Sequence, residues 1–347
     1  MAESSPLYRR WLFALASLLV LSTFAMMALG GAVTSHNAGM AVPGGFTTAG
    51  SWSLITPVND WWHAFDTRLE HAHRLLGYVV GLAAIAFVVG VWLPSTAQRG
   101  WVKVLAVVVL LFVVAQGVLG AYRVNHNSLL LAGIHGVTGQ IYLGITVLAA
   151  AAVVRRWTRR DPAQGRGPFV ARVLTLGLLA ALLLQLTLGS AVRHSHSALA
   201  IPDWPLHYGQ VMPPMDDQAL ADVVAAYPAD KLPERYGYLS EGGVYQPWQI
   251  HLHFTHRVMG YAVFLAGLGV SAFMLARYGG RNLGPVLVPA LLLGLLMFTQ
   301  VMLGIATVAS GEDANFATLH QTCGAALLAT AVWLAVRVRI TPAGAAA

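Results

Sequence analysis

Charged residues are scarce in this chain. Asp, Glu, Lys and Arg together make up 10% of its 347 residues, whereas soluble domains carry roughly a quarter. Hydrophobic residues make up 57% of the sequence and fall in long runs. These observations argue against a soluble fold and indicate an integral membrane protein.

Cysteine is nearly missing as well. The one cysteine, Cys323, lies inside an apolar run, which is a common place for a small buried residue. A single cysteine excludes an intrachain disulfide, and it excludes a metal or iron–sulfur site built from cysteines. Any ligand set for a metal must therefore come from other side chains.

Eight apolar segments are each long enough to cross a hydrocarbon core about 30 Å thick, which takes ~20 helical residues. Since unpaired backbone polar groups are not tolerated in lipid, each crossing must be a helix. The first segment is too long for a signal-peptide core, so we expect it to remain uncleaved. The segments are 11–33, 75–93, 101–121, 129–154, 173–192, 258–276, 285–308 and 317–336.

The net charge of +7 comes largely from basic residues in alternate loops. Short loops rich in Lys and Arg stay on the cytoplasmic side, so we expect both termini in the cytoplasm and the protein in the cell inner (plasma) membrane. We do not interpret this charge as a nucleic-acid surface. The residues concerned are Arg9, Arg10, Arg99, Lys103, Arg155, Arg156, Arg159, Arg160, Arg166, Arg277, Arg281, Arg337 and Arg339.

Two long loops, 34–72 and 193–257, fall on the opposite, outer side. The second loop contains several prolines, and we expect it to form a partly ordered cap with a short helix near 216–227. Its acidic residues are interpreted as a solvated face. They are Asp216, Asp217, Asp222, Asp230, Glu234 and Glu241.

The sequence repeats itself. HRLLGYVVGL begins at His73 and HRVMGYAVFL at His256, 183 residues later; QGVLG begins at Gln116 and QVMLG at Gln300, 184 residues later. The same order of helices in both halves predicts parallel repeats related by an axis along the membrane normal.

The repeat predicts an all-α membrane fold of two tandem four-helix bundles. We assign the N-terminal half to residues 1–160 and the C-terminal half to residues 161–347. Facing helices of a four-helix bundle commonly build cofactor sites in the bundle core.

Each half carries two histidines near the outer ends of its even-numbered helices. The pairs are His73 with His135, and His256 with His320. Neutral imidazole is a good axial ligand for haem iron, so we predict that each pair grips one haem. The alternative is that these histidines cap helix ends at the interface. Four ionisable residues at equivalent positions near membrane depth favour the functional interpretation.

An arginine follows the first histidine of each pair. The guanidinium groups of Arg74 and Arg257 suit the propionate carboxylates of haem, although ordinary interfacial anchoring would also explain them. The other nearby histidines, His71, His251 and His253, are interpreted as surface or supporting groups.

The halves differ three residues before the first ligand. Glu70 precedes His73, whereas His253 stands at the matching place before His256. A carboxylate beside only one haem could act as a general base or stabilise a developing carbocation. The alternative is that Glu70 interacts with the positive N-terminal end of its helix.

These motifs resemble the haem A synthase family. The resemblance spans nearly the whole chain and rests on residues 70–77 (EHAHRLLG), on residues 254–259 (FTHRVM), and on His135 and His320. In one respect the chain departs from the pattern. Many bacterial members carry a cysteine pair in an outer loop of the first half, whereas the loop 34–72 of this chain contains no cysteine. Any mechanism that uses a disulfide in that loop is excluded here.

The resemblance implies a division of labour between the halves. The first half would bind the substrate haem O near His73 and His135, and the second would hold a haem b cofactor through His256 and His320. Glu70 matches the family's catalytic carboxylate. The implied reaction oxidises a ring methyl group of haem O to the formyl group of haem A, the product used by cytochrome oxidases. A haem O synthase, an electron donor and the lipid bilayer are the partners expected.

Two other functions remain open at this stage. A dihaem electron carrier would place its haems near opposite membrane faces, whereas all four histidines lie at outer helix ends. A haem-binding chaperone would need no chemistry, and a carboxylate in one half only, Glu70, favours the enzyme.

Overall fold

The computed structural model describes residues 6–48, 50–51, 62–96, 98–154, 169–237, 244–279 and 284–340. Across these ranges the fold is helical, with no strand longer than an isolated bridge. Eight helices are long and apolar enough to cross a membrane, so the protein is a multi-pass membrane protein as predicted. They are α1 (Pro6–Ser35), α3 (Phe65–Trp92), α4 (Gly100–Asn125), α5 (Leu129–Val153), α7 (Phe169–His194), α9 (Pro247–Tyr278), α10 (Gly284–Ala309) and α11 (Ala314–Ile340).

Two of these helices begin about ten residues before their apolar segments. The sequence predicts starts at residues 75 and 258, whereas α3 begins at Phe65 and α9 at Pro247. The extra turns contain Glu, His and Arg, which hide a helix from a hydropathy criterion. As a result, the first histidine of each pair lies inside a helix instead of preceding it.

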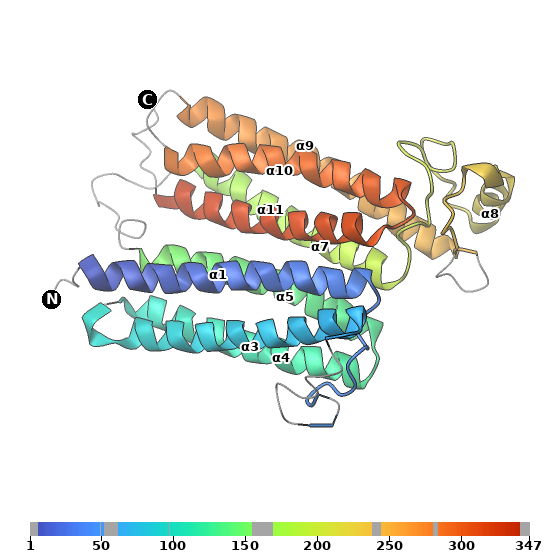
Figure 1. Ribbon diagram of the computed structural model, residues 1–347. Coiled ribbons are helices and arrows are strands. Elements are labelled where there is room, and N and C mark those ends of the chain that lie inside the picture. Colours follow the sequence, from blue (N-terminus) through green and yellow to red (C-terminus); the bar gives the residue numbers. More distant parts are fainter. Residues whose placement is uncertain are drawn as a thin grey trace.

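The helices form two groups of four, seen as two layers in Figure 1. Helices α1, α3, α4 and α5 enclose one core, and α7, α9, α10 and α11 enclose the other. Contacts of α11 with α1 and α5, and of α5 with α7, join the groups. The predicted boundary at 160/161 lies between α5 and α7, outside the described residues. The cores include Leu12, Phe87, Val109 and Tyr142 in the first group and Leu182, Tyr278, Leu293 and Leu334 in the second.

The outward faces of the helices are apolar. Leu82, Leu111, Leu265 and Leu295 each expose more than three fifths of their surface. In water such a surface would drive aggregation, but lipid tails solvate it without cost. Since apolar burial does not drive helix association in lipid, small core residues such as Ala84, which permit close contact, matter more for packing.

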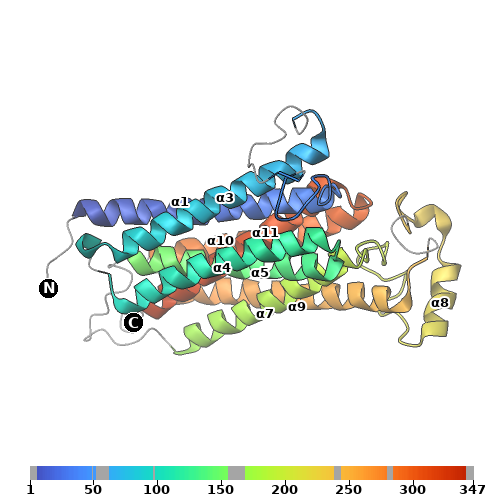
Figure 2. The ribbon, with the colours of Figure 1, turned by 90° about the horizontal axis from the view of Figure 1, so that it is seen from below.

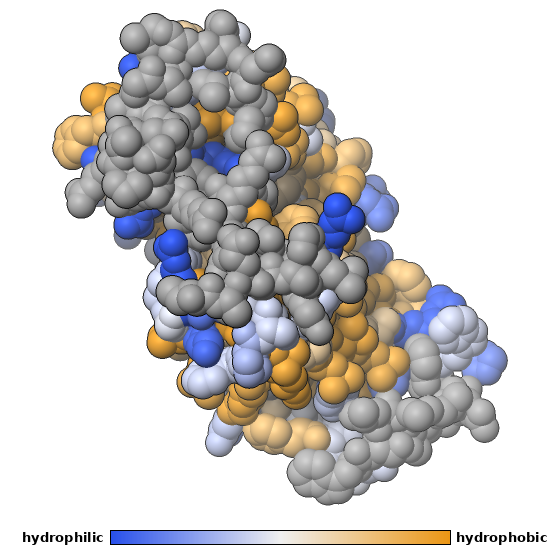
Figure 3. Space-filling model, turned by 90° about the vertical axis from the view of Figure 1, so that its left-hand side faces the viewer, coloured by the Kyte–Doolittle hydropathy of each residue, from blue (hydrophilic) through white to orange (hydrophobic). Residues whose placement is uncertain are grey.

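The first and last described residues, Pro6 and Ile340, lie at one end of the molecule, and the lobe that carries α8 (Asp217–Ala226) lies at the other, as Figures 1 and 2 both show. Figure 3 views the end with Pro6 and Ile340, where hydrophilic residues gather among the helix ends. The described basic residues at this end include Arg99, Lys103, Arg277 and Arg337. The predicted loop residues Arg155, Arg156, Arg159, Arg160, Arg166 and Arg281 lie outside the described residues, as does the side chain of Arg9.

The outer lobe contains the predicted short helix. The Asp216 side chain caps α8 by accepting a hydrogen bond from Ala219 N at 2.9 Å, and Leu220 is buried against Tyr208 and Ile201. The acidic residues of the lobe are exposed, as expected for a solvated face; those described are Asp216, Asp217, Asp222, Asp230 and Glu234. Glu241 lies outside the described residues.

The repeat extends into the segments that follow α1 and α7. We name residues 36–48 the first outer loop and residues 195–207 the second, 159 positions later. Asn37 and His196 both adopt a φ of 55°, and isolated antiparallel bridges close both loops at equivalent positions. Matching backbone conformations at a constant offset support a duplicated unit.

Candidate functional site

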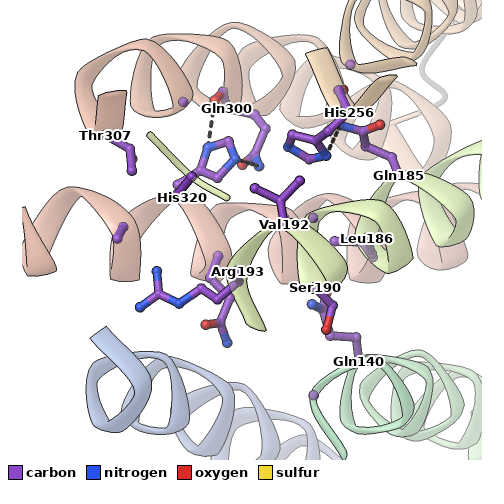
Figure 4. A pocket seen from close by; sticks show the side chains of 18 of the residues that line it. Gln140, Gln185, Leu186, Ser190, Val192, Arg193, His256, Gln300, Thr307 and His320 are labelled. Carbon is purple, nitrogen blue, oxygen red and sulfur yellow. Dashed lines mark hydrogen bonds between the residues drawn. The ribbon is translucent and has the colours of Figure 1, made fainter. Parts of the chain in front are cut away.

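All four predicted histidines line one connected cavity of about 290 Å³. His73 and His135 reach it from α3 and α5, and His256 and His320 reach it from α9 and α11. Each lies within the first ten residues or so of its helix, at the end of the molecule that carries α8. Figure 4 shows the second pair facing the same space. The sequence predicted two pairs at one level, and the fold brings both pairs to a single cavity.

Each histidine ring lies against a glycine of a neighbouring helix. A Cβ added to Gly30 would lie 2.9 Å from Cε1 of His73, and one added to Gly189 would lie 3.1 Å from Cε1 of His256. Real Cβ atoms are rarely this close to another atom. The missing side chain therefore allows the ring to pack on the helix backbone, which fixes the ring's position.

The second histidine of each pair, His135 or His320, makes the same kind of contact. The corresponding distances are 3.1 Å from Gly120 to His135 and 3.0 Å from Gly304 to His320. The glycines are the last residues of the repeated QGVLG and QVMLG motifs. Sequence reasoning noticed those motifs but did not connect their glycines with the histidines.

The two pairs differ in their hydrogen bonds. His320 Nδ1 lies 3.1 Å from the Gln300 carbonyl, to which it can donate, and the Gln300 amide lies 3.3 Å from Nε2. The Gln185 amide nitrogen lies 3.1 Å from His256 Nδ1 (Figure 4). A hydrogen bond to one ring nitrogen fixes the orientation of the other. Both histidines of the second pair are therefore held by polar neighbours.

The first pair has weaker support. Within the described part of the chain, His73 Nδ1 has no hydrogen-bond partner, and the His135 ring interacts with the backbone of Gln116, the counterpart of Gln300, without meeting normal hydrogen-bond geometry. The residue at the position of Gln185 in the first half is Met26, which cannot donate. The Gln116 amide instead donates to Thr138 Oγ1 at 2.7 Å. The halves thus share their histidines but differ in what supports them.

Arg74 holds the first outer loop. Its Nη1 donates to the carbonyls of Gly44 (2.7 Å) and Thr47 (3.2 Å), and its Nη2 donates to the Val42 carbonyl at 2.8 Å. Nη2 also lies 2.6 Å from Glu70 Oε1. All four terminal N–H groups are therefore engaged within the protein.

Arg257 repeats this arrangement at the second outer loop. It donates to the carbonyls of Asp203 (2.7 Å), Leu206 (3.4 Å) and Ile201 (2.8 Å), and its Nε lies 3.2 Å from His253. The three carbonyls are the equivalents of those held by Arg74. Most N–H groups of Arg74 and Arg257 thus tie the loops to the helices, while Arg257 also lines the cavity. That these two arginines bind propionates stays a prediction.

Glu70 and His253 occupy equivalent places in this arrangement. Glu70 Oε2 accepts a hydrogen bond from Val42 N at 2.7 Å, and His253 Nδ1 accepts one from Ile201 N at 3.2 Å. Glu70 is 2% exposed and lies one turn from His73, but it is not among the cavity-lining residues. It is the sixth residue of α3, beyond the first turn where the helix dipole acts most strongly.

Two further histidines are more deeply buried than the sequence suggested. His253 is 4% exposed and His71 is 1% exposed, so a surface role is wrong for both, although a supporting role fits His253. Sequence reasoning also missed Arg123 and Arg193, which line the cavity. The available signal was their position at the outer ends of apolar segments, where a charged residue is costly.

Comparison with known proteins gives one family and a set of relatives. The family model COX15-CtaA, described as a cytochrome oxidase assembly protein, matches residues 63–332. The chain is similar to proteins named "Heme A synthase". That of Caulobacter vibrioides is 26% identical over 364 aligned positions and covers 95% of each chain. That of Rhodopseudomonas palustris is 28% identical over 285 positions, covering 78% of this chain and 67% of the relative. That of Halalkalibacterium halodurans is 23% identical, covering 82% and 84%.

The loop contacts generate a prediction that needs no ligand. Changing Arg257 to Gln removes charge-assisted hydrogen bonds, each worth roughly 1.5–3 kcal/mol, so backbone amides of the second outer loop should exchange hydrogen at least about tenfold faster. Hydrogen–deuterium exchange with mass spectrometry measures this. Arg277→Gln, at the opposite end of α9, is the matched control. Equal exchange in both variants would show that Arg257 does not hold the loop.

Proposed function

We propose that this chain, which belongs to the COX15-CtaA family of cytochrome oxidase assembly proteins, is a haem A synthase, a membrane oxidoreductase of haem A biosynthesis. The relatives that share this name align with most of the chain. The reaction we propose oxidises a ring methyl group of haem O to a formyl group. Water as the oxygen source balances this change: the methyl carbon gains one oxygen atom and releases protons and electrons, and the separate electron-transfer partner proposed below accepts the electrons.

The observation that carries the proposal is the single cavity with two histidine pairs. Burial in a low-dielectric site favours neutral imidazole, which is the form that ligates iron. The buried Nδ1 atoms of His73 and His135 and the glycine contacts of all four rings fit flat, bis-imidazole-ligated groups. The residues present therefore fit haem.

The unequal support of the two pairs favours different roles for them. A resident cofactor benefits from a ligand whose second ring nitrogen donates a hydrogen bond. His320 Nδ1 can donate in this way to the Gln300 carbonyl, so we assign haem b to the pair His256 and His320. A substrate must enter and leave, so we assign haem O to His73 and His135. On this assignment residues 1–160 form the substrate half and residues 161–347 the cofactor half. When bound, haem b supplies one-electron transfer.

Glu70 is the carboxylate that we assign to the chemistry of the substrate half. It lies one helical turn from His73 and has no carboxylate counterpart in the second half, where His253 stands. Both Glu70 oxygens accept a hydrogen bond, yet each keeps a further lone pair. We propose that Glu70 holds a proton released from the methyl group or stabilises positive charge that develops there.

The membrane orientation and the partners of the protein follow from the same proposal. The basic helix ends near the termini support a cytoplasmic location for both termini in the inner (plasma) membrane, which places the cavity near the outer face. An apolar substrate such as haem O would reach it from the bilayer. A haem O synthase as supplier and a separate electron-transfer partner remain part of the proposal. A dihaem carrier is not favoured, because both histidine pairs lie at one level of the membrane.

The assignment of haem b to the second pair predicts a spectroscopic loss. Replacing either His256 or His320 with Ala should abolish the low-spin haem b spectrum of the purified protein, since a single remaining imidazole does not give bis-histidine ligation. Absorption and electron paramagnetic resonance spectra measure this. His126→Ala, which changes an exposed histidine at the end of α4, should leave the spectrum unchanged. Retention of the spectrum in both cavity variants would refute the assigned ligands.

The glycine contacts predict a milder effect. A Cβ at residue 304 meets the His320 ring at 3.0 Å, so Gly304→Ala should tilt the ring and either shift the low-spin spectrum or reduce the haem b content severalfold. Gly269→Ala is the matched control, because a Cβ there meets no atom within 4 Å and Ala favours a helix by about 1 kcal/mol. Identical spectra for the two variants would remove ring packing as the determinant.

The role of Glu70 can be separated from its contact with the loop. Glu70→His copies the second half, where a histidine makes the equivalent hydrogen bond, so the first outer loop should stay in place and haem O should still bind. Formation of haem A, measured by extraction and chromatography, should fall by at least about a hundredfold, the usual scale of acid–base catalysis. Wild-type conversion by this variant would show that Glu70 serves only to hold the loop.

A further inference from the structure

Two partly buried arginines, Arg123 and Arg193, extend from α4 and α7, not from the helices α3 and α9 that carry the loop-binding arginines. Arg123 lies in the last turn of α4 and Arg193 in the last turn of α7. Both line the histidine cavity and also a smaller cavity of about 150 Å³ next to it. In Figure 4 the Arg193 side chain extends toward α1, consistent with its hydrogen bond to Ser35. The two guanidinium groups thus stand where the histidine cavity meets the outer one.

These arginines break the repeat in opposite ways. The residue equivalent to Arg123 in the second half is Thr307, and the residue equivalent to Arg193 in the first half is Thr34. Both threonines also line the cavity, but each donates its hydroxyl to a carbonyl of its own helix, at 2.8 Å and 3.0 Å. At these two equivalent positions, each half therefore has one arginine and one threonine: the arginine lies on α4 in the first half and on α7 in the second.

The positive charge of these groups is poorly compensated within the protein. Arg123 donates to the Gly39 carbonyl at 3.4 Å, and among the described residues no carboxylate lies within 4 Å of it. Arg193 donates to Ser35 Oγ at 2.7 Å, and its nearest carboxylate oxygen, on Glu312, is 3.9 Å away. A buried guanidinium is costly unless an anion and hydrogen-bond acceptors accompany it. Both groups therefore have N–H donors left for an anionic ligand in the cavity.

We propose that Arg123 and Arg193 bind the propionate carboxylates of the two haems, one arginine for each histidine pair. Arg123 lines the cavity together with His73 and His135, and Arg193 lines it together with His256 and His320. The planar guanidinium pairs with a carboxylate through two parallel hydrogen bonds. Arg74 and Arg257, for which the sequence predicts the same role, use most of their N–H groups on the outer loops. The inference rests on the proposed haem binding.

Esterified haem separates this role from the effect of the histidines. Full-length protein purified from haem-deficient cells is titrated in detergent with haem b and with its dimethyl ester, which lacks both carboxylates. We expect the wild type to bind the ester about tenfold more weakly, the scale of one charge-assisted hydrogen bond. Arg193→Gln should bind haem b about tenfold more weakly and should no longer distinguish it from the ester, since the two changes remove one interaction.

Matched variants complete the test. Arg235→Gln makes the same charge change at an exposed residue that lines only the outer cavity, and it should behave as the wild type. Arg193→Lys, which keeps the charge, should recover part of the preference for haem b. For Arg123→Gln the titration uses haem O and its ester after haem b has filled the second site.

The outcomes distinguish this inference from the proposed function. A wild type that shows the low-spin haem b spectrum, together with an Arg193→Gln variant that keeps wild-type affinity and preference, would overturn the arginine assignment alone. Equal weakening by Arg235→Gln would also overturn it, because a general charge effect would then explain the result. If the wild type itself shows no low-spin spectrum with haem b, the haem assignment and the inference that rests on it both fail.

Discussion

The packing of an imidazole ring on a helix backbone, made possible by a glycine, is the contact on which the site depends. It occurs four times, with added Cβ atoms reaching 2.9–3.1 Å from a ring carbon. Within a membrane, helices associate through close van der Waals contact because apolar burial provides no driving force between them. The same small residues that let the helices approach therefore also position the rings. The same glycine contacts therefore determine both the helix packing and the positions of the histidine rings. A change that separates the helices would also displace the rings.

The two halves place similar residues around the cavity, and a few residues differ between them. The outer loops, the arginines that hold them and the histidine–glycine contacts match at constant offsets. The differences lie beside the histidines: Gln185 against Met26, Glu70 against His253, and the exchanged Arg and Thr positions. Each difference changes a hydrogen bond or a charge while the backbone stays the same. This is how one scaffold can hold a resident group tightly in one half and leave the other half for a substrate.

The charges at the outer end fall into two classes. Arg74 and Arg257 donate hydrogen bonds to backbone carbonyls of the loops, so their guanidinium groups stabilise the local structure. Arg123 and Arg193 have few partners within the protein and face the cavity. The desolvation cost of the second class is reasonable only if a ligand shares it. Residues of the same type, at similar depth and within a short distance, thus have different functions because their acceptors differ.

The sequence by itself determined the class of protein and the eight helices able to cross a membrane, and it predicted the repeat and the four histidines, because each depends on local composition or on spacing along the chain. The sequence prediction placed the starts of α3 and α9 about ten residues too late, because the outer turns of these helices are polar and lack the hydropathy of a membrane-spanning segment. Only the tertiary structure decided that both histidine pairs share one cavity, that glycines from neighbouring helices support the rings, and that Arg123 and Arg193 line the same cavity. Those properties arise from contacts between residues far apart in the chain, such as Arg193 with Ser35 and Gln185 with His256, and no local pattern records such contacts.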